Sequence, residues 1–212
     1  MTETERKTVC IINGSLRGKN AASLAFARDL ERYLPADVFE TISVGVKARV
    51  KDRYPEATLK NIARADALVL IFPLHNYGLP GGLMRLLEEY YGYAKAGKDY
   101  KRAGVYVIVN CAFPRPAAVN GEVLRVVRNF CARLSLQWRF AVCIGTGPVV
   151  VMTRKVPFFY HTLNKAYADI ARDILSEDLE EKKDYFIKPI IPEPIIAAIR
   201  RHYERSGKMI EA

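Results

Sequence analysis

Long apolar runs are missing from this 212-residue sequence, and none approaches the roughly 20 residues that a helix needs to cross a bilayer. Four of the first seven residues are charged, and no apolar segment with a small-residue cleavage site follows them, so we expect no secretory signal. The sequence therefore predicts a soluble, cytoplasmic protein without a membrane span.

Cysteine is scarce, with four residues and no CxxC pair. Structural zinc sites usually draw on closely spaced thiol and imidazole ligands, and this spacing is absent. At least three of the cysteines lie in apolar runs, where a buried thiol behaves as a small hydrophobic group. We expect reduced thiols and no zinc at Cys10, Cys111, Cys131 and Cys143.

Acidic residues are outnumbered, 23 against 33 basic ones, which gives a net charge of +10. The excess lies almost wholly before residue 151, because the tail from there on holds 11 basic and 10 acidic residues. No run of five or more basic residues occurs, and the basic side chains are spread through amphipathic segments, so nucleic acid is a disfavoured partner. Such a surface suits anionic small molecules, for example phosphorylated cofactors.

Internal repeats and low-complexity stretches are also absent, and the chain, half of it apolar, has the size of one domain. Short apolar runs alternate with amphipathic segments of helical period. The apolar runs predict strands at Thr8–Asn13, Val38–Val44, Ala67–Phe72, Val105–Asn110 and Phe140–Gly145. The amphipathic segments predict helices at Asn20–Leu34, Glu56–Ala65, Leu79–Tyr93, Val119–Leu136, Phe158–Leu179 and Ile195–Arg205.

This alternation of strands and helices predicts an α/β fold with a parallel sheet built from right-handed βαβ units. In such sheets the ligand site lies at the carboxyl ends of the strands, where the strand order reverses. We therefore expect a binding site in the loops that follow the strands.

The loop after the first predicted strand, residues 13–20, has a composition that suits a phosphate. Gly14 and Gly18 permit tight turns, and the following helix start offers free amide groups and its dipole. The loop is neither GxGxxG nor a Walker motif, so an ordinary strand-to-helix turn with a Ser or Asn cap is an equal alternative. The polar side chains that could contact a phosphate are Ser15, Arg17, Asn20 and Ser23.

The loop after the third predicted strand could hold a planar ring. An aromatic, an imidazole and an amide stand between two prolines, and together they can stack on a ring and hydrogen-bond its edge. For His75 the alternative is a partly buried, satisfied histidine without chemistry, but its place in this loop favours binding over a role as catalytic base. The residues concerned are Pro73, Leu74, His75, Asn76, Tyr77 and Gly78.

Three segments resemble the flavodoxin-like NAD(P)H-dependent FMN reductases and quinone reductases. Ile12–Arg17, with Ser23 downstream, looks like the flavin-phosphate loop of this family. Ala65–Leu74 followed by Leu79–Pro80 looks like its third strand and isoalloxazine loop. Val109–Pro114 is similar to a loop that such proteins place near the flavin.

The resemblance covers roughly residues 8 to 147 and implies a flavodoxin-like three-layer sandwich. Its sheet would have five parallel strands in the order 2-1-3-4-5, with extra helices at the C-terminus. Residues 1–150 would form the FMN-binding domain, and residues 151–212 a helical extension of the same domain.

The resemblance also implies a set of cofactor contacts. Ser15, Arg17, Asn20 and Ser23 would hold the FMN phosphate, residues 73–78 would line the isoalloxazine, and Asn110, Cys111 and Phe113 would form a third wall. Thr146–Gly147 is a further candidate contact, although a turn that merely ends a strand explains it as well.

The implied activity is electron transfer from NADPH or NADH through FMN to a quinone, flavin or similar small acceptor, by a cytoplasmic homodimer. The cofactor carries this chemistry, so no catalytic acid, base, nucleophile or metal is expected. Cys111 has no base beside it in the sequence, which favours a packing role over a nucleophilic one. Two alternatives share the fold: an electron carrier of the flavodoxin type, which is typically acidic, and a flavin-free binding protein.

Overall fold

Six parallel strands form a single sheet in the order β2-β1-β3-β4-β5-β6. The computed structural model describes residues 6–46, 52–153, 157–176 and 182–188, together with residues 194 and 201. The strands are β1 Lys7–Asn13, β2 Phe39–Gly45, β3 Ala67–Pro73, β4 Gly104–Asn110, β5 Gln137–Ile144 and β6 Tyr185–Ile187. The helices are η1 Gly18–Asn20, α1 Ala22–Glu31, α2 Glu56–Ala63, α3 Gly81–Lys95, α4 Pro116–Val119, α5 Gly121–Arg133, α6 Gly147–Thr153 and α7 Pro157–Leu175.

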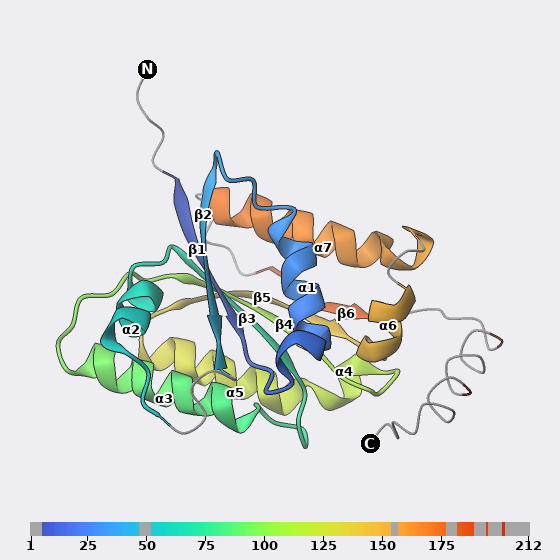
Figure 1. Ribbon diagram of the computed structural model, residues 1–212, viewed down its shortest axis with the longest axis horizontal. Helices are drawn as coiled ribbons and strands as arrows, with labels where there is room; N and C mark the ends of the chain where they lie inside the picture. Colours follow the sequence, from blue (N-terminus) through green and yellow to red (C-terminus); the bar gives the residue numbers. More distant parts are fainter. Residues whose placement is uncertain are drawn as a thin grey trace.

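Helices cover both faces of the sheet, with α1, α6 and α7 on one side and α2, α3 and α5 on the other (Figure 1). Successive side chains of a strand point to opposite faces, so each central strand contributes to two cores. In β1, for example, Cys10 and Ile12 pack beneath α2 and α3, whereas Val9 and Ile11 pack beneath α1. This double burial explains why the central strands read as continuous apolar runs.

The sheet has six strands, so the expectation of five was wrong. The additional strand, β6, pairs in parallel with β5, and Tyr185 lies opposite Val142. Just before it, the carboxylate of Asp184 accepts a hydrogen bond from the backbone N–H of Ala141 at 2.7 Å. Three strand residues behind the charged run of residues 180–184 give no periodic signal, which is why the sequence did not predict this strand.

Three helices differ from the predicted bounds. The helix expected over Val119–Leu136 corresponds to α5, Gly121–Arg133, and the short α4 before it, Pro116–Val119, was not predicted. Helix α6 follows β5 directly, where only a turn was considered. The predicted helix Phe158–Leu179 corresponds to α7, which ends at Leu175, and the predicted helix Ile195–Arg205 lies outside the described residues.

Helix α7 and strand β6, from the part of the chain after residue 151, belong to the same sheet and core as the preceding strands. Helix α7 buries Leu163, Tyr167 and Ile170 against the face that α1 also covers. At its far end, Asp173 forms a buried ion pair with Arg139 of β5. The extension thus shares one hydrophobic core with the preceding strands.

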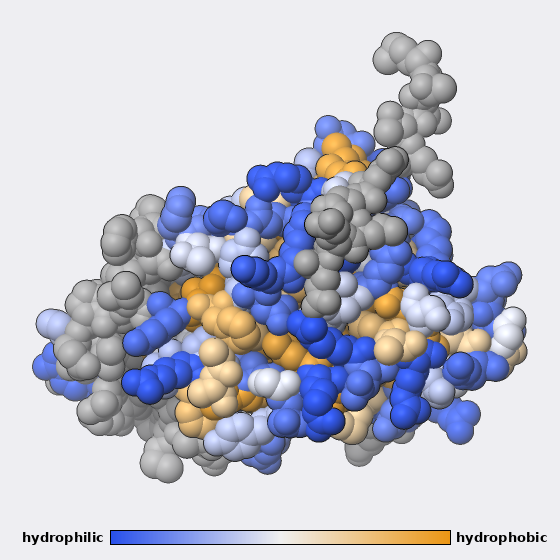
Figure 2. All heavy atoms as spheres, turned by 180° about the vertical axis from the view of Figure 1, so that it is seen from behind, coloured by the Kyte–Doolittle hydropathy of each residue, from blue (hydrophilic) through white to orange (hydrophobic). Residues whose placement is uncertain are grey.

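All four cysteines are free and buried, as the apolar runs around them predicted. Burial raises the pKa of each thiol, and that of Cys10 reaches about 12. Within the described ranges, no helix combines the length and apolar character that a membrane crossing requires. Figure 2 shows a face on which hydrophilic residues predominate and apolar ones form a broken band across the middle.

Candidate functional site

The loops that follow β1, β3, β4 and β5 meet at one edge of the sheet, because the strands run parallel (Figure 1). Backbone hydrogen bonds tie neighbouring loops together there. The N–H of Gly14 donates to the carbonyl of Ile71 at 2.8 Å, and that of Leu74 donates to the carbonyl of Asn110, also at 2.8 Å. Hydrogen bonds therefore join the loops at the carboxyl edge to one another, and we call this set of loops the rim.

Asn13, the last residue of β1, organises the first loop. Its Oδ1 accepts hydrogen bonds from the backbone N–H of Ser15 at 3.1 Å and from the hydroxyl of Ser23 at 2.8 Å. The hydroxyl of Ser15 in turn accepts the N–H of Arg17 at 3.2 Å. These Asx- and Ser-type turns replace backbone hydrogen bonds and fix the curve of the loop. We did not single out Asn13, although a polar residue that ends an apolar strand before Gly-Ser is a signal for such a turn.

The predicted phosphate contacts divide into two groups. Ser15 and Ser23 are buried and hydrogen-bonded within the loop, so they shape it. Arg17 and Asn20 are exposed on its surface. Helix α1 follows with alanine at its N-cap, no side-chain cap and no acidic residue in its first turn, so no side chain satisfies its first amide groups. The Ser or Asn cap of the alternative is therefore absent from this helix, while an ordinary strand-to-helix turn stays an alternative.

The second loop is a tight two-residue turn. His75 and Gly78 exchange two backbone hydrogen bonds, of 3.1 and 2.8 Å, and the two residues between them, Asn76 and Tyr77, have φ angles of 47° and 61°. Both central residues are left-handed, as in a type I′ turn. For a residue as large as tyrosine this conformation costs on the order of 1–2 kcal/mol, and such strain is frequently found at functional sites.

The turn directs the ring of Tyr77 towards the neighbouring loop. There it stacks on Phe113, with ring centroids 6.0 Å apart and planes inclined by 19°. Both rings remain about half exposed, at 57% and 47%. We call Tyr77 and Phe113 the aromatic pair. It offers a planar apolar surface at the rim, of the kind on which another ring can stack.

His75 is exposed, and its imidazole has no partner among the residues that the structure describes. The alternative reading of a partly buried, satisfied histidine is therefore wrong. The side chain stands free beside the aromatic pair, where a ligand could reach it.

Two buried polar atoms at the ends of β4 and β5 lack a hydrogen-bond partner among the described residues. They are Oδ1 of Asn110 and the hydroxyl of Thr146. Thr146 also has a left-handed φ of 47°, which is uncommon for a β-branched residue. Buried polar atoms are almost always satisfied, so each of these two calls for a further partner, as do the buried polar atoms of Tyr90, Trp138 and Tyr167 elsewhere among the described residues.

Backbone hydrogen bonds join the loop after β4, which contains Cys111 and Phe113, to the loop after β5. The N–H of Thr146 donates to the carbonyl of Phe113 at 3.0 Å, and that of Gly147 donates to the carbonyl of Cys111 at 2.9 Å. Cys111 itself is buried, and its thiol donates to the Phe113 carbonyl at 3.4 Å. Burial raises the pKa of this thiol, so the structure supports the packing role and not the nucleophile.

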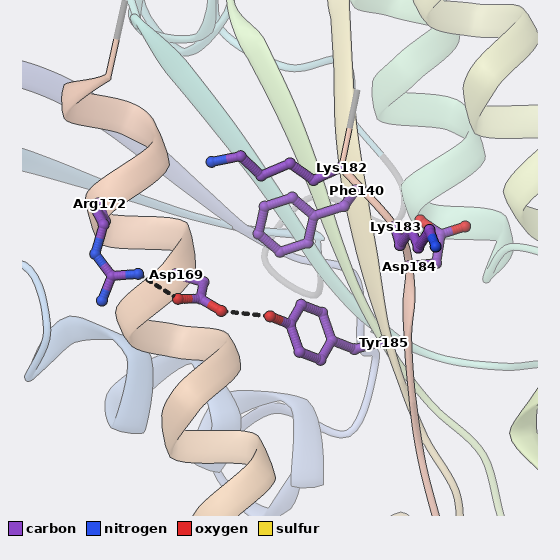
Figure 3. Close-up of a pocket in the computed structure, with 7 residues that line it drawn as sticks. All are labelled: Phe140, Asp169, Arg172, Lys182, Lys183, Asp184 and Tyr185. Carbon is purple, nitrogen blue, oxygen red and sulfur yellow. Dashed lines mark hydrogen bonds and ion pairs between the residues drawn. The ribbon is translucent and has the colours of Figure 1, made fainter. Parts of the chain in front are cut away.

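A separate cavity lies between α7 and the first halves of β5 and β6, away from the carboxyl edge (Figure 3). Its polar groups are already engaged. Asp169 accepts the hydroxyl of Tyr185 and pairs with Arg172 at 2.6 Å. Lys182 pairs with Asp173 at 2.5 Å. The groups that line this cavity therefore serve to hold α7 and β6 to the sheet.

Comparison with known proteins is informative at the level of structure. No protein-family model matches the sequence, and no curated protein matches it. Among solved structures, the NAD(P)H:quinone oxidoreductase of Methanothermobacter marburgensis is similar with a TM-score of 0.60 at 14% identity, over 84% of this chain and 100% of that one.

Two further solved structures are similar to the same degree. An NADH:FMN oxidoreductase gives a TM-score of 0.59 at 16% identity, over 81% of this chain and 91% of that one. An FMN-dependent NADH-azoreductase from Bacillus anthracis, in complex with FMN, gives 0.58 at 13% identity, over 78% and 100%. At these identities the likeness concerns the fold, and the chain has the flavodoxin-like α/β fold.

Proposed function

We propose that the chain is an FMN-dependent NAD(P)H oxidoreductase that passes electrons from a nicotinamide nucleotide to a quinone, flavin or similar small acceptor. The observation that carries the proposal is the joint position of two features at one edge of the sheet. The loop after β1, residues 13–20, has a composition that suits a phosphate and leads into the uncapped helix α1; we call it the phosphate-type loop. The aromatic pair consists of one residue from the loop after β3 and one from the loop after β4. A flavin mononucleotide needs both features, one for its phosphate and one for its ring.

The residues present fit such a cofactor. Arg17 and Asn20, with the free amide groups at the start of α1, would hold the phosphate, while Ser15 and Ser23 keep the loop in shape. Residues 73–78 and Phe113 would line the ring. Polar groups of the ligand would satisfy the buried atoms of Asn110 and Thr146 that lack partners.

Bound FMN would supply the redox chemistry, because the flavin can accept a hydride and pass on electrons. The protein's part is to bind and orient. The hydrogen-bonded turn around Asn13 fixes the position of the phosphate, and the strained turn at Tyr77 fixes the aromatic surface. Because the cofactor carries the chemistry and the protein only binds and orients it, no catalytic acid, base, nucleophile or metal is required from the chain. It also accords with a Cys111 thiol that is buried and protonated.

Other solved structures of this fold support the proposal by their own descriptions: an FMN-dependent NADH-azoreductase, an NADH:FMN oxidoreductase and an NAD(P)H:quinone oxidoreductase. Four free, buried thiols are compatible with a reducing compartment such as the cytoplasm. We also propose residues 1–150 as the FMN-binding part, with residues 151–212 as its extension.

We propose a homodimer as the working form. Large apolar side chains stand exposed on the loops and the helix start at the carboxyl edge, and such groups favour a protein contact. They are Leu16, Tyr77, Met84 and Phe113. Light scattering coupled to size-exclusion chromatography should give twice the chain mass, and a single chain mass at micromolar concentration would contradict this part of the proposal.

The function is tested by the visible spectrum of the purified protein after FMN is added and the excess removed, followed by anaerobic addition of NADPH or NADH. We expect a retained flavin spectrum that bleaches on addition of the nucleotide. Retained flavin that does not bleach would indicate an electron carrier instead. Absence of retained flavin would overturn the FMN assignment.

Tyr77→Gly should keep the turn and remove the ring. Glycine adopts a left-handed φ without strain, which offsets the lost stacking on Phe113, so we expect stability to change by less than about 1 kcal/mol. Loss of an aromatic contact should weaken FMN binding by about 0.5–1.5 kcal/mol, or roughly two- to tenfold, and should shift the flavin absorption bands. Thermal melting and fluorescence titration measure the two effects.

Tyr77→Phe, which keeps the ring, is the matched control and should bind FMN as the unmodified chain does. If Tyr77→Gly left both the flavin spectrum and the affinity unchanged, Tyr77 would not belong to the cofactor site.

A further inference from the structure

Four of the loops at the carboxyl edge contain no acidic residue. This holds for all four segments that follow β1, β3, β4 and β5, namely residues 14–21, 74–80, 111–121 and 145–153. The same segments contain Arg17, Lys19 and Arg115. Because the chain as a whole has 23 acidic residues, their absence from these four segments favours the approach of an anion.

Arg115 is, together with Lys19, a basic residue of these segments that the proposed FMN site does not use. It is exposed, and it forms no ion pair with any residue that the structure describes. By contrast, Arg125 on the next helix pairs with Glu122. Arg115 stands two residues after Phe113, in the loop that the hydrogen bond from Thr146 to the Phe113 carbonyl holds in place. A fixed loop thus presents an unpaired guanidinium beside the aromatic pair.

The two arginines of the rim stand on different loops. Arg17 belongs to the loop after β1 and Arg115 to the loop after β4, and β3 lies between these two strands. Two strand spacings separate them, which amounts to about 10 Å. If the FMN phosphate lies on the first loop, Arg115 is left for an anionic group of a second ligand.

For the proposed function the second ligand is a nicotinamide dinucleotide. NADH and NADPH differ only in the 2′-phosphate of the adenosine ribose. In dinucleotide sites of the Rossmann fold, those that bind NADH commonly hold the 2′-hydroxyl with an Asp or Glu, whereas those for NADPH place an arginine near the phosphate. The four loops of this rim provide the arginine and no carboxylate. Arginine is also the side chain best suited to a phosphate, because its planar fork donates two parallel hydrogen bonds.

We propose that Arg115 binds the 2′-phosphate of the dinucleotide and that the chain therefore uses NADPH in preference to NADH. This inference rests on the proposed function for the identity of the second ligand. Within it, Arg115 is a specificity-determining residue and takes no part in electron transfer.

Calorimetric titration of the FMN-loaded protein with NADP⁺ and with NAD⁺ tests the proposal, because the oxidised nucleotides bind without reacting. We expect NADP⁺ to bind at least tenfold more tightly than NAD⁺. Arg115→Gln should weaken NADP⁺ binding by about 10- to 100-fold, the scale of lost charge-assisted hydrogen bonds. It should change NAD⁺ binding less than about threefold, since that ligand has no group for Arg115.

Arg133→Gln is the matched control. Arg133 is an exposed arginine at the other end of α5, so the variant removes the same charge far from the rim and should leave both affinities unchanged. Equal weakening of NADP⁺ and NAD⁺ in Arg115→Gln, or no change in either, would overturn the assignment.

A second titration separates this inference from the proposed function. Adenosine 2′,5′-bisphosphate and AMP are compared on the protein without flavin, where the result does not depend on FMN. A preference for the bisphosphate that Arg115→Gln abolishes supports the site even if FMN is never retained. Absence of that preference in a protein that retains and reduces FMN would overturn the Arg115 proposal alone.

Discussion

Asp173→Ala should lower the free energy of unfolding by about 3–5 kcal/mol, the cost of removing one partner from a buried ion pair. Both side chains are almost fully enclosed, with exposed fractions of 3% for Arg139 and 0% for Asp173. The guanidinium donates to both carboxylate oxygens, at 2.8 and 2.9 Å, and the hydroxyl of Tyr106 adds a third hydrogen bond at 2.7 Å. Without the carboxylate, the charge of Arg139 stays buried and loses its bidentate partner.

Urea denaturation measures the loss, and Glu122→Ala is the control. Glu122 pairs with Arg125, but both side chains are about two-thirds exposed, so that substitution should cost between about 0 and 1 kcal/mol. The double variant R139M/D173L should recover part of the loss, because apolar residues of similar size can replace a buried pair. If Asp173→Ala cost no more than the control, the buried pair would have no special weight in holding α7 to the sheet.

The same group predicts how stability depends on acid pH. Burial alone would raise the pKa of Asp173, but hydrogen bonds from Arg139, Lys182 and Tyr106 outweigh it and lower the pKa from 3.8 to about 2. Because the pKa of the folded state lies below that of the unfolded state, this contribution is complete above about pH 4. It is lost as the pH falls towards 2. In Asp173→Ala, this part of the acid-induced loss of stability should disappear.

The sequence predicted the central sheet well and its edge poorly, for physical reasons. β1, β3, β4 and β5 are buried on both faces, and such strands must be apolar throughout. β6 is different, because three residues at a sheet edge are held largely by backbone pairing and by the carboxylate of Asp184. Contacts of this kind join residues about 40 positions apart and leave no local pattern.

The candidate site, too, was predictable in part: its position was, but its internal structure was not. The rule that ligands bind at the carboxyl ends of parallel strands selected loops that do lie together at one edge of the sheet. The internal construction of those loops was not predictable. The left-handed turn at Asn76 and Tyr77 lacks the glycine that usually marks a type I′ turn, and the central role of Asn13 appears only once Ser23 folds back onto it.

Gly14→Ala should disrupt the phosphate-type loop. A Cβ atom at this position would lie 2.8 Å from Cβ of Phe72 and 2.9 Å from Cδ2 of Leu83, closer than such atoms can approach. Overpacking of this kind typically costs about 1–3 kcal/mol. The strain falls on the residue between Asn13 and Ser15, so the loop that would hold the FMN phosphate has to move. We expect FMN affinity to fall at least tenfold, which fluorescence titration would measure alongside thermal stability.

Gly45→Ala gives this prediction a matched control at the same edge of the sheet. Gly45 pairs with Asn13 at the end of the neighbouring strand β2, and a Cβ atom there would meet nothing within 4 Å. That variant should fold and bind FMN as the unmodified chain does. If Gly14→Ala did so too, the loop after β1 could adjust without loss, and the phosphate would have to be held elsewhere on the rim.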